Sequence, residues 1–260
     1  MRKKTLIAST VALVLLLFVL ALPLTAAPLS DWDYYQQSGH TAPKWDSLVE
    51  AGFGAFDSGN TDTAINFLER ARSLGCKDGL VTAKLAAIQE LRGNIVLALK
   101  LLEQAEPILR NRYPKHPVTL GLSEHLGTLL YQQNRYDEAL TKFLDSLRMQ
   151  GNDFLKLYLV GQIYRMKGMT KEAIAYFEKS LSCDVPLQQQ AQPNLKLLVE
   201  MELLKLYSDN KKDDKALNMA NQILARDPQN PAAISVRDEI SRRKYKQKEQ
   251  DVMQRIIEKQ

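Results

Sequence analysis

The sequence has few of the residues on which catalysis and metal binding usually depend. Its 260 residues include two cysteines and three histidines. His40, His116 and His125 lie far apart, none belongs to a His-Glu-x-x-His motif, and none is close to a cysteine. The chain also lacks a Gly-x-Ser-x-Gly elbow and a phosphate-binding glycine-rich loop. We therefore expect no enzyme activity, no cofactor, no metal and no small-molecule substrate.

The body of the chain also lacks an excess of positive charge. The net charge is +5, but Arg2, Lys3 and Lys4 supply +3, and residues 235–260 supply another +3. The residues between these two ends have a net charge of −1. Because a nucleic-acid-binding protein usually has a basic face on its folded body, we expect no nucleic acid partner.

Long apolar runs are confined to the N-terminus. Residues 5–22 carry no charge and follow three basic residues, and the apolar composition continues to about Ala27. Residues 1–27 therefore predict a signal anchor or a signal peptide. Pro28 would follow the small residues of a cleavage site and disfavours cleavage, which makes the anchor the first choice.

The charges around this segment predict its orientation. Basic residues precede it, whereas residues 28–43 contain Asp31 and Asp33 and no lysine or arginine. The positive-inside rule then exports the rest of the chain. We expect a bacterial inner-membrane protein that faces the periplasm, or a soluble secreted or periplasmic protein after cleavage; a eukaryotic lumenal protein fits the same pattern. Residues 28–44 form a linker, whose aromatic residues lie at the membrane interface or pack on the domain that follows.

A repeat accounts for most of the remaining chain. Residues 127–147 and 161–181 align at an offset of 34, and they share glycine, glutamate, alanine, phenylalanine, serine and leucine at matching positions. The same pattern occurs five times, each with a residue that ends one helix and an alanine five positions later. The helix-ending residues are Gly59, Gly93, Asn134, Gly168 and the pair Asn210-Lys211.

The spacing that the five repeats share has physical reasons. Glycine, and sometimes asparagine, ends a helix because the left-handed conformation disfavours a Cβ atom. Gly127 and Gly161 lie inside predicted helices, where glycine costs about 1 kcal/mol. We expect close packing of the paired helices to offset that cost, and we expect Phe143 and Phe177 to fill the resulting groove between helices. Five side chains are predicted to cap the second helices: Asp62, Asn94, Asp137, Thr170 and Asp213.

The pattern resembles the tetratricopeptide repeat. Val160-Gly161-x-x-Tyr164 with Ala173-x-x-x-Phe177 is the best copy of the family's motif. The resemblance implies an all-α, right-handed α-solenoid over residues 45–230, with units at 45–78, 79–112, 120–153, 154–187 and 197–230. Residues 112–119 and 186–193 are insertions, and residues 231–260 form a capping helix and a charged tail. We expect the tail to be solvated; the alternative is contact with acidic lipid or a partner. Cys76 and Cys183 fall in the first and fourth units, too far apart for a disulfide.

The resemblance also implies a function. In this family the first helix of each pair lines a concave face that commonly binds a segment of a partner protein. On this chain the residues expected on or near that face are Phe53, Lys84, Glu124, His125, Tyr131, Tyr158, Gln162, Arg165, Lys205 and Asp209. Phe53 and Tyr158 could instead pack between repeats. The Lys/Asn clamp that some members use for a terminal carboxylate is absent.

We therefore expect a non-enzymatic protein-binding scaffold, tethered to a membrane through residues 6–27, in a cell-envelope or secretion assembly. Two alternatives use the convex face and the inserted loops. They are a structural subunit of a stable membrane complex and an accessory regulator of an envelope enzyme.

Overall fold

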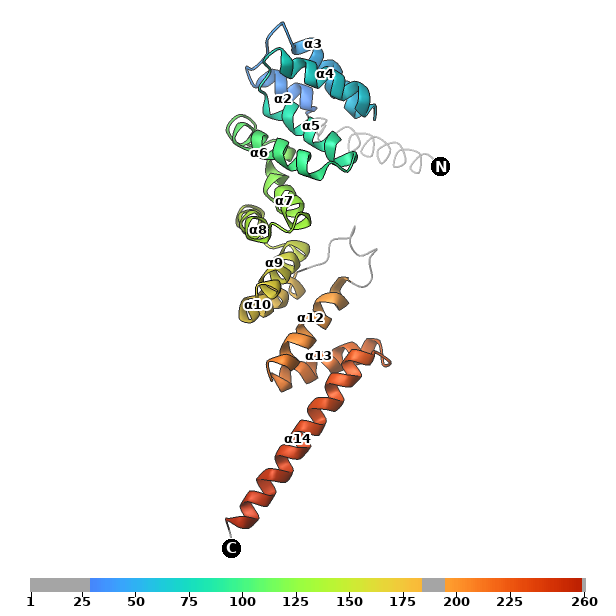
Figure 1. The fold of residues 1–260 in the computed structure, drawn as a ribbon, viewed down its shortest axis with the longest axis vertical. Coiled ribbons are helices and arrows are strands. Elements are labelled where there is room, and N and C mark those ends of the chain that lie inside the picture. The colour runs from blue at the N-terminus through green and yellow to red at the C-terminus, as the bar shows by residue number, and fades with distance from the viewer. Residues whose placement is uncertain (1–28, 184–194, 259–260) are drawn as a thin grey trace, which may run out of the picture. The chain divides into compact units, whose positions relative to one another are not determined.

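The computed structural model describes residues 29–183 and 195–258. These residues form helices and turns without a strand, and they fall into two compact units that meet at Leu80 and Val81 (Figure 1). The predicted anchor or signal at 1–27 lies outside the described residues, as does the insertion at 186–193. Within the described ranges, no helix has the length and apolar character needed to span a bilayer.

The first unit contains α2 (Asp31–Gln37), α3 (Asp46–Asp57) and α4 (Thr61–Ser73). Helix α2 occupies part of the predicted linker, and Tyr35 on it is fully buried. The ring of Tyr35 stacks on Trp32 at 5.3 Å between ring centroids and meets Phe53 edge-on at 6.3 Å. Tyr35 therefore packs on the first helix pair. Phe53 is only 1% exposed and the Tyr35 ring lies against it, so it packs in the core, which is the second of the two places considered for it.

The second unit is also built of helix pairs. Its helices are α5 (Gly79–Leu91, whose first two residues belong to the first unit), α6 (Ile95–Arg112), α7 (Pro117–Gln132), α8 (Tyr136–Gln150), α9 (Phe154–Met166), α10 (Thr170–Leu181), α12 (Leu195–Asp209), α13 (Asp213–Arg226) and α14 (Pro231–Ile257). From α6 onward, each helix packs against the next one along the described chain. The predicted fold class, an all-α array of tetratricopeptide-like pairs, is confirmed.

Each pair is joined by the same tight turn. Asn134 shows its geometry: its N–H donates to the carbonyl of Tyr131 at 3.0 Å, and the N–H of Arg135 donates to the carbonyl of Leu130 at 2.9 Å. This pair of hydrogen bonds satisfies carbonyls that the helix leaves free at its end. The turn needs a left-handed residue, and the five residues that supply it are Gly59, Gly93, Asn134, Gly168 and Lys211.

The predicted helix caps are mostly wrong. Of the residues that precede the second helices, only Asn60 accepts a hydrogen bond from the helix backbone, at 3.1 Å from the N of Thr63. Asn94 is at the expected position but makes no such bond, and Arg135, Met169 and Lys212 occupy the other caps. The tight turn leads directly into the next helix and fixes which residue is the cap. The side chains of Asp62, Asp137, Thr170 and Asp213 therefore fall in the first turn, where a carboxylate favours the helix dipole.

The predicted close packing of the paired helices at the two glycines is confirmed. A Cβ atom on Gly127 would lie 2.9 Å from the Phe143 ring, and one on Gly161 would lie 2.7 Å from the Phe177 ring. Both phenylalanines are fully buried. The glycines therefore let α7 approach α8 and let α9 approach α10.

The first insertion lengthens two helices. Helix α6 runs to Arg112, and α7 begins at Pro117. His116 caps α7, because its Nδ1 accepts a hydrogen bond from the N of Val118 at 3.1 Å. This histidine therefore has a structural role at the start of α7.

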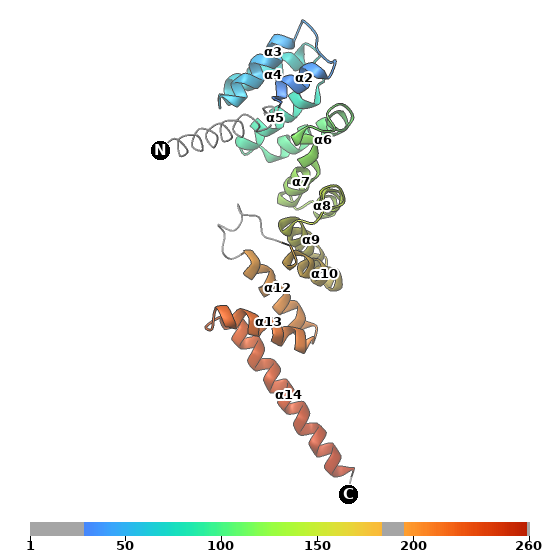
Figure 2. The same ribbon diagram turned by 180° about the vertical axis from the view of Figure 1, so that it is seen from behind.

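Helix α14 closes the second unit. Asn230 caps its start, and Ala233 and Ile240 are fully buried beside α12 and α13. Farther along, Arg243 and Lys244 form ion pairs with Asp213 and Asp214 of α13 at 2.9 and 2.8 Å. The helix then runs on past α13 (Figure 2).

Candidate protein-binding site

The first helices of successive pairs in the second unit are joined by polar contacts. His125 Nε2 of α7 lies 2.6 Å from Glu90 Oε2 of α5. Lys156 Nζ of α9 lies 3.0 Å from Glu124 Oε2 of α7. Glu124 and His125, expected on the binding face, thus lie where neighbouring first helices meet.

Lys156 is a buried cation that the sequence did not single out. It is 5% exposed, and its ammonium donates to Glu124 Oε2 and to Gln150 Oε1, the latter at 2.9 Å. Burial of an ammonium is costly unless it is paired and hydrogen-bonded. Lys156 and Glu124 therefore hold α9 against α7, and Glu124 is not free to act as a simple contact residue.

Aromatic side chains follow on α7 and α9. The ring of Tyr131 lies 5.5 Å from the ring of Tyr136. Burial is the main reason that the pKa of the Tyr131 hydroxyl is raised, and the neighbouring Tyr136 and Tyr158 hydroxyls add to it, while the positive charge of Arg165 opposes it. Tyr131, Tyr158 and Arg165 therefore lie near one another, as expected for one face.

Gln162 lies below the surface and is hydrogen-bonded to several of these side chains. It is 6% exposed, and its Nε2 donates to the Tyr158 hydroxyl at 2.9 Å and to Glu202 Oε1 at 3.1 Å. Its Oε1 accepts a hydrogen bond from Arg165 Nε at 2.9 Å. With its amide used in this way, Gln162 positions Tyr158, Arg165 and Glu202. It is not itself exposed for binding.

Tyr158 contacts both the polar network and the core. Its hydroxyl is part of the surface network, and its ring packs against Phe177 of α10, with 5.9 Å between ring centroids. Because one side chain serves both roles, truncating it would disturb the core as well as the surface.

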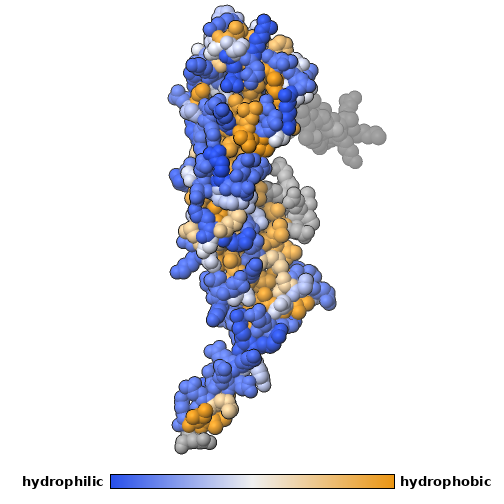
Figure 3. Space-filling view, viewed as in Figure 1, coloured by the Kyte–Doolittle hydropathy of each residue, from blue (hydrophilic) through white to orange (hydrophobic). Residues whose placement is uncertain are grey.

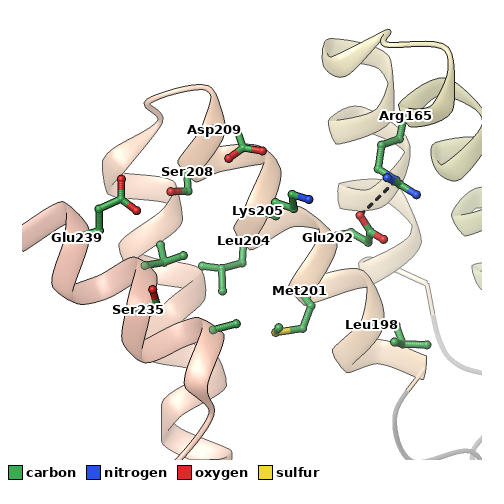
Figure 4. Close-up of a pocket in the computed structure, with 12 residues that line it drawn as sticks. Arg165, Leu198, Met201, Glu202, Leu204, Lys205, Ser208, Asp209, Ser235 and Glu239 are labelled. Carbon is green, nitrogen blue, oxygen red and sulfur yellow. Dashed lines mark ion pairs between the residues drawn. The ribbon is translucent and has the colours of Figure 1, made fainter.

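A hollow lies beside this network, between α12 and α14. It encloses about 470 Å³ and reaches Arg165 of α9 at one end (Figure 4). Its apolar lining comes from Leu198, Met201, Leu204, Ala232 and Val236, and its polar lining comes from Arg165, Glu202, Lys205, Ser208, Asp209, Ser235 and Glu239.

The charges sit around the apolar floor. Arg165 Nε and Glu202 Oε2 form an ion pair at 3.3 Å at the α9 end, as Figure 4 shows. Lys205 and Asp209 follow one and two turns along α12, and Glu239 faces them from α14. An apolar floor with charged groups of both signs at its rim suits a short amphipathic segment of a protein.

The structure brings only some of the predicted residues to this hollow. Arg165, Lys205 and Asp209 line it, and Tyr158 and Gln162 lie behind Arg165. The others do not line it, and Lys84, Glu124, His125 and Tyr131 belong to α5 and α7.

Sequence reasoning missed the apolar floor. Leu198 and Met201 precede Lys205 by seven and four positions, which is the spacing of one helix face. That spacing could have identified them. Ala232, Val236 and Glu239 of α14 also have the spacing of one helix face, but this part of the chain was expected to cap the array and not to line a site.

The described ranges contain no cluster of three or more His, Cys, Asp or Glu side chains that could hold a metal ion. Both cysteines are free thiols.

Two family models match the chain. Both describe the tetratricopeptide repeat, one over residues 80–151 and the other over residues 125–188. Residues 80–188 contain tetratricopeptide repeats. A search of curated proteins finds no match.

Solved structures support the tetratricopeptide fold over more of the chain. YrrB, described as a TPR protein with an unusual peptide-binding site, is 15% identical with a TM-score of 0.54, and the match covers 80% of this chain and 98% of YrrB. MamA AMB-1 is 18% identical with a TM-score of 0.52, over 73% and 95%. MamA from Desulfovibrio magneticus RS-1 is 14% identical with a TM-score of 0.51, over 73% and 98%. At these identities the likeness shows the fold.

Proteins with tetratricopeptide repeats are generally non-enzymatic scaffolds, so the repeats suggest a scaffold for protein–protein interaction. The family models stop before α12, α13 and α14. Apart from Arg165, the residues that line the hollow therefore lie beyond those that the models match.

Proposed function

We propose that this protein is a non-enzymatic scaffold that binds a short amphipathic segment of a partner protein in the hollow between α12 and α14. The observation that carries the proposal is the hollow itself, an apolar floor of α12 and α14 side chains with Arg165, Lys205 and Asp209 at its rim. The likeness to YrrB, whose structure is described as having a peptide-binding site, supports a peptide as the ligand.

The chemistry of the lining defines the partner segment. One or two apolar side chains would enter the floor beside Leu198 and Met201, where burial contributes about 25 cal/mol for each Å² of apolar surface. A carboxylate next to them would reach Lys205, for which the structure gives no ion pair within the described ranges. Asp209 and Glu239 would accept a lysine or arginine on the other side.

The Arg165–Glu202 ion pair gives this site a fixed edge. Gln162 holds both partners, so Arg165 has one orientation before a ligand arrives. A group that is already in place loses less entropy when it binds. A partner carboxylate would therefore meet Arg165 without first ordering it.

Substitutions at the floor and rim test the site. Leu198 is half exposed, so Leu198→Asp should leave the fold intact while it places a charge on the floor. Lys205→Glu reverses the rim charge, and Lys171→Glu makes the same change on the exposed start of α10 as a matched control. Partners of the full-length chain would be captured with each variant and quantified by mass spectrometry.

We expect the same partner to be recovered by the wild type and Lys171→Glu, and to be lost at least tenfold with Leu198→Asp and Lys205→Glu. Equal recovery by all four proteins would refute binding at the hollow. A partner lost only when the convex helices α6, α8 or α10 are altered would favour a structural subunit.

The tethering of the scaffold is a separate part of the proposal. Residues 6–27 would hold the repeats on the exported side of a membrane, within a cell-envelope or secretion assembly. The sequence supports this through its basic start, its uncharged segment and the acidic residues after it. An alkaline phosphatase fused after Gln260 should be active, and activity of a fused cytoplasmic reporter would refute export.

A further inference from the structure

The last part of α14 has an exposed apolar stripe. Residues 244–258 are all exposed. Among them are five large apolar side chains between 49% and 72% exposed, namely Tyr245, Val252, Met253, Ile256 and Ile257. Figure 3 shows apolar surface gathered at this end of the helix.

The stripe faces away from the core. At about 100° per residue, its centre lies about 170° around the helix from the face that contains Ala233, Val236 and Ile240. The same helix therefore packs on the unit with one face at its start and presents a second apolar face at its end. Arg243 and Lys244, bound to Asp213 and Asp214, mark the boundary between these two parts.

The charges around the stripe are sorted. On the helical wheel Lys248 and Arg255 border one edge, and Lys246 lies along the other edge, two turns before Met253. Asp251 and Glu258 lie on roughly the opposite face. Cations with long apolar stems are thus placed beside the apolar side chains, while two of the three acids point away.

This arrangement fits an anionic lipid surface. A helix that lies in the membrane interface buries an apolar face, and its lysines and arginines reach the headgroups from the borders of that face. Tyrosine is also suited to the interface, because it has an apolar ring and a polar tip. We propose that residues 245–257 of α14 bind the surface of a bilayer that contains anionic phospholipid.

A second copy of the chain is a poorer occupant. In two-stranded helix pairs, the residues that border the apolar seam face each other across it. Since Lys248 and Arg255 border one edge and Lys246 the other, a second copy would bring cations against cations in either orientation. An anionic surface has the complementary charge.

Glu249 is the exception and gives the proposal a sharp test. It lies within the stripe, between Tyr245 and Val252. At a membrane its charge would oppose binding, so Glu249→Gln should strengthen binding. Val252→Asp should weaken it about tenfold or more, because it replaces an apolar contact with a charge.

The location of the helix can be measured independently of the N-terminal segment. The full chain, with Cys183→Ser, would carry a nitroxide label at Ile256→Cys or, as the matched control, at Gln254→Cys on the opposite side of the same turn. Cys76 is 3% exposed and is left in place. The protein would be placed in nanodiscs of phosphatidylcholine alone or with phosphatidylglycerol, and label depth would be read from collisions with oxygen and with a water-soluble nickel chelate.

We expect the Ile256 label to enter lipid with phosphatidylglycerol, and the Gln254 label to stay in water in both discs. Glu249→Gln should raise the lipid-bound fraction of the Ile256 label, and Val252→Asp should return this label to water. Equal nickel access for both labels would overturn the proposal. Equal lipid entry in both discs would also overturn it. So would protection of the Ile256 label that rises with protein concentration in the absence of lipid, because such protection would indicate a second copy of the chain. The proposal does not depend on the binding hollow, because a variant defective in one site keeps the other.

Discussion

Replacing Gly161 with alanine tests the reason for the helix contacts. At an exposed position inside a helix, alanine is more favourable than glycine by about 1 kcal/mol. At Gly161, however, the new Cβ atom would lie 2.7 Å from two ring carbons of Phe177. Such a distance is well inside van der Waals contact, so α9 or the phenylalanine has to move.

The packing around Phe177 decides the sign of the effect. Phe177 is fully buried, and the ring of Tyr158 lies 5.9 Å away, so the phenylalanine has little room to shift. Overpacking a core costs about 1–3 kcal/mol. We expect this cost to exceed the gain in helix propensity and Gly161→Ala to destabilise the second unit by about 1–2 kcal/mol.

Gly121 is the matched control. It lies inside α7 with no heavy atom within 4 Å of the Cβ position. Gly121→Ala should therefore stabilise the protein by about 0.5–1 kcal/mol. Unfolding of the two variants would be followed by circular dichroism against urea and against temperature.

A second substitution separates a specific clash from a general defect. Ala86 and Leu102 take the same places in the second repeat as Gly161 and Phe177 in the fourth, and both are buried. The double variant Gly161→Ala, Phe177→Leu should then lose less stability than the two single changes predict together. A rise in the unfolding midpoint for Gly161→Ala, equal to that of Gly121→Ala, would refute the close-packing explanation.

Three other substitutions extend these tests. Burial alone would raise the pKa of Glu106, but the ion pair with Lys142 lowers it. The stabilisation that this ion pair provides is therefore present above about pH 4.3, and it is lost as the pH falls through the lowered pKa. Glu106→Gln should cost about 1 kcal/mol at pH 7. In urea titrations this difference should shrink as the pH falls, and it should vanish only once the pH is below the lowered pKa of Glu106. Tyr35→Phe removes a buried hydroxyl that donates to Asp46 at 2.9 Å, and it should lower the stability of the first unit by about 1–3 kcal/mol in hydrogen exchange. Lys211→Gly relieves a left-handed backbone at φ 54° and should raise the thermal midpoint, with a gain of about 0.5–1 kcal/mol; a lower midpoint would contradict the role of this turn.

The site was predicted less completely than the fold. The resemblance to the tetratricopeptide repeat placed Arg165, Lys205 and Asp209 on the expected binding face, because it assigns that face to the first helix of each pair. It did not distinguish Gln162, which is buried, from Arg165, which is partly exposed, although both follow the same pattern. The difference depends on Glu202, forty residues away from Gln162 in the sequence.

The sequence by itself determined the helix pairs and their turns. Those features depend on local backbone preferences, such as the left-handed conformation at Asn134. They also depend on the spacing within each helix pair, which brings Gly161 next to Phe177. Only the tertiary structure decided where the pairs leave a hollow and which face of α14 stays uncovered. Both depend on how α12, α13 and α14 pack, and a residue's own neighbours in the sequence do not specify which distant helix will cover it.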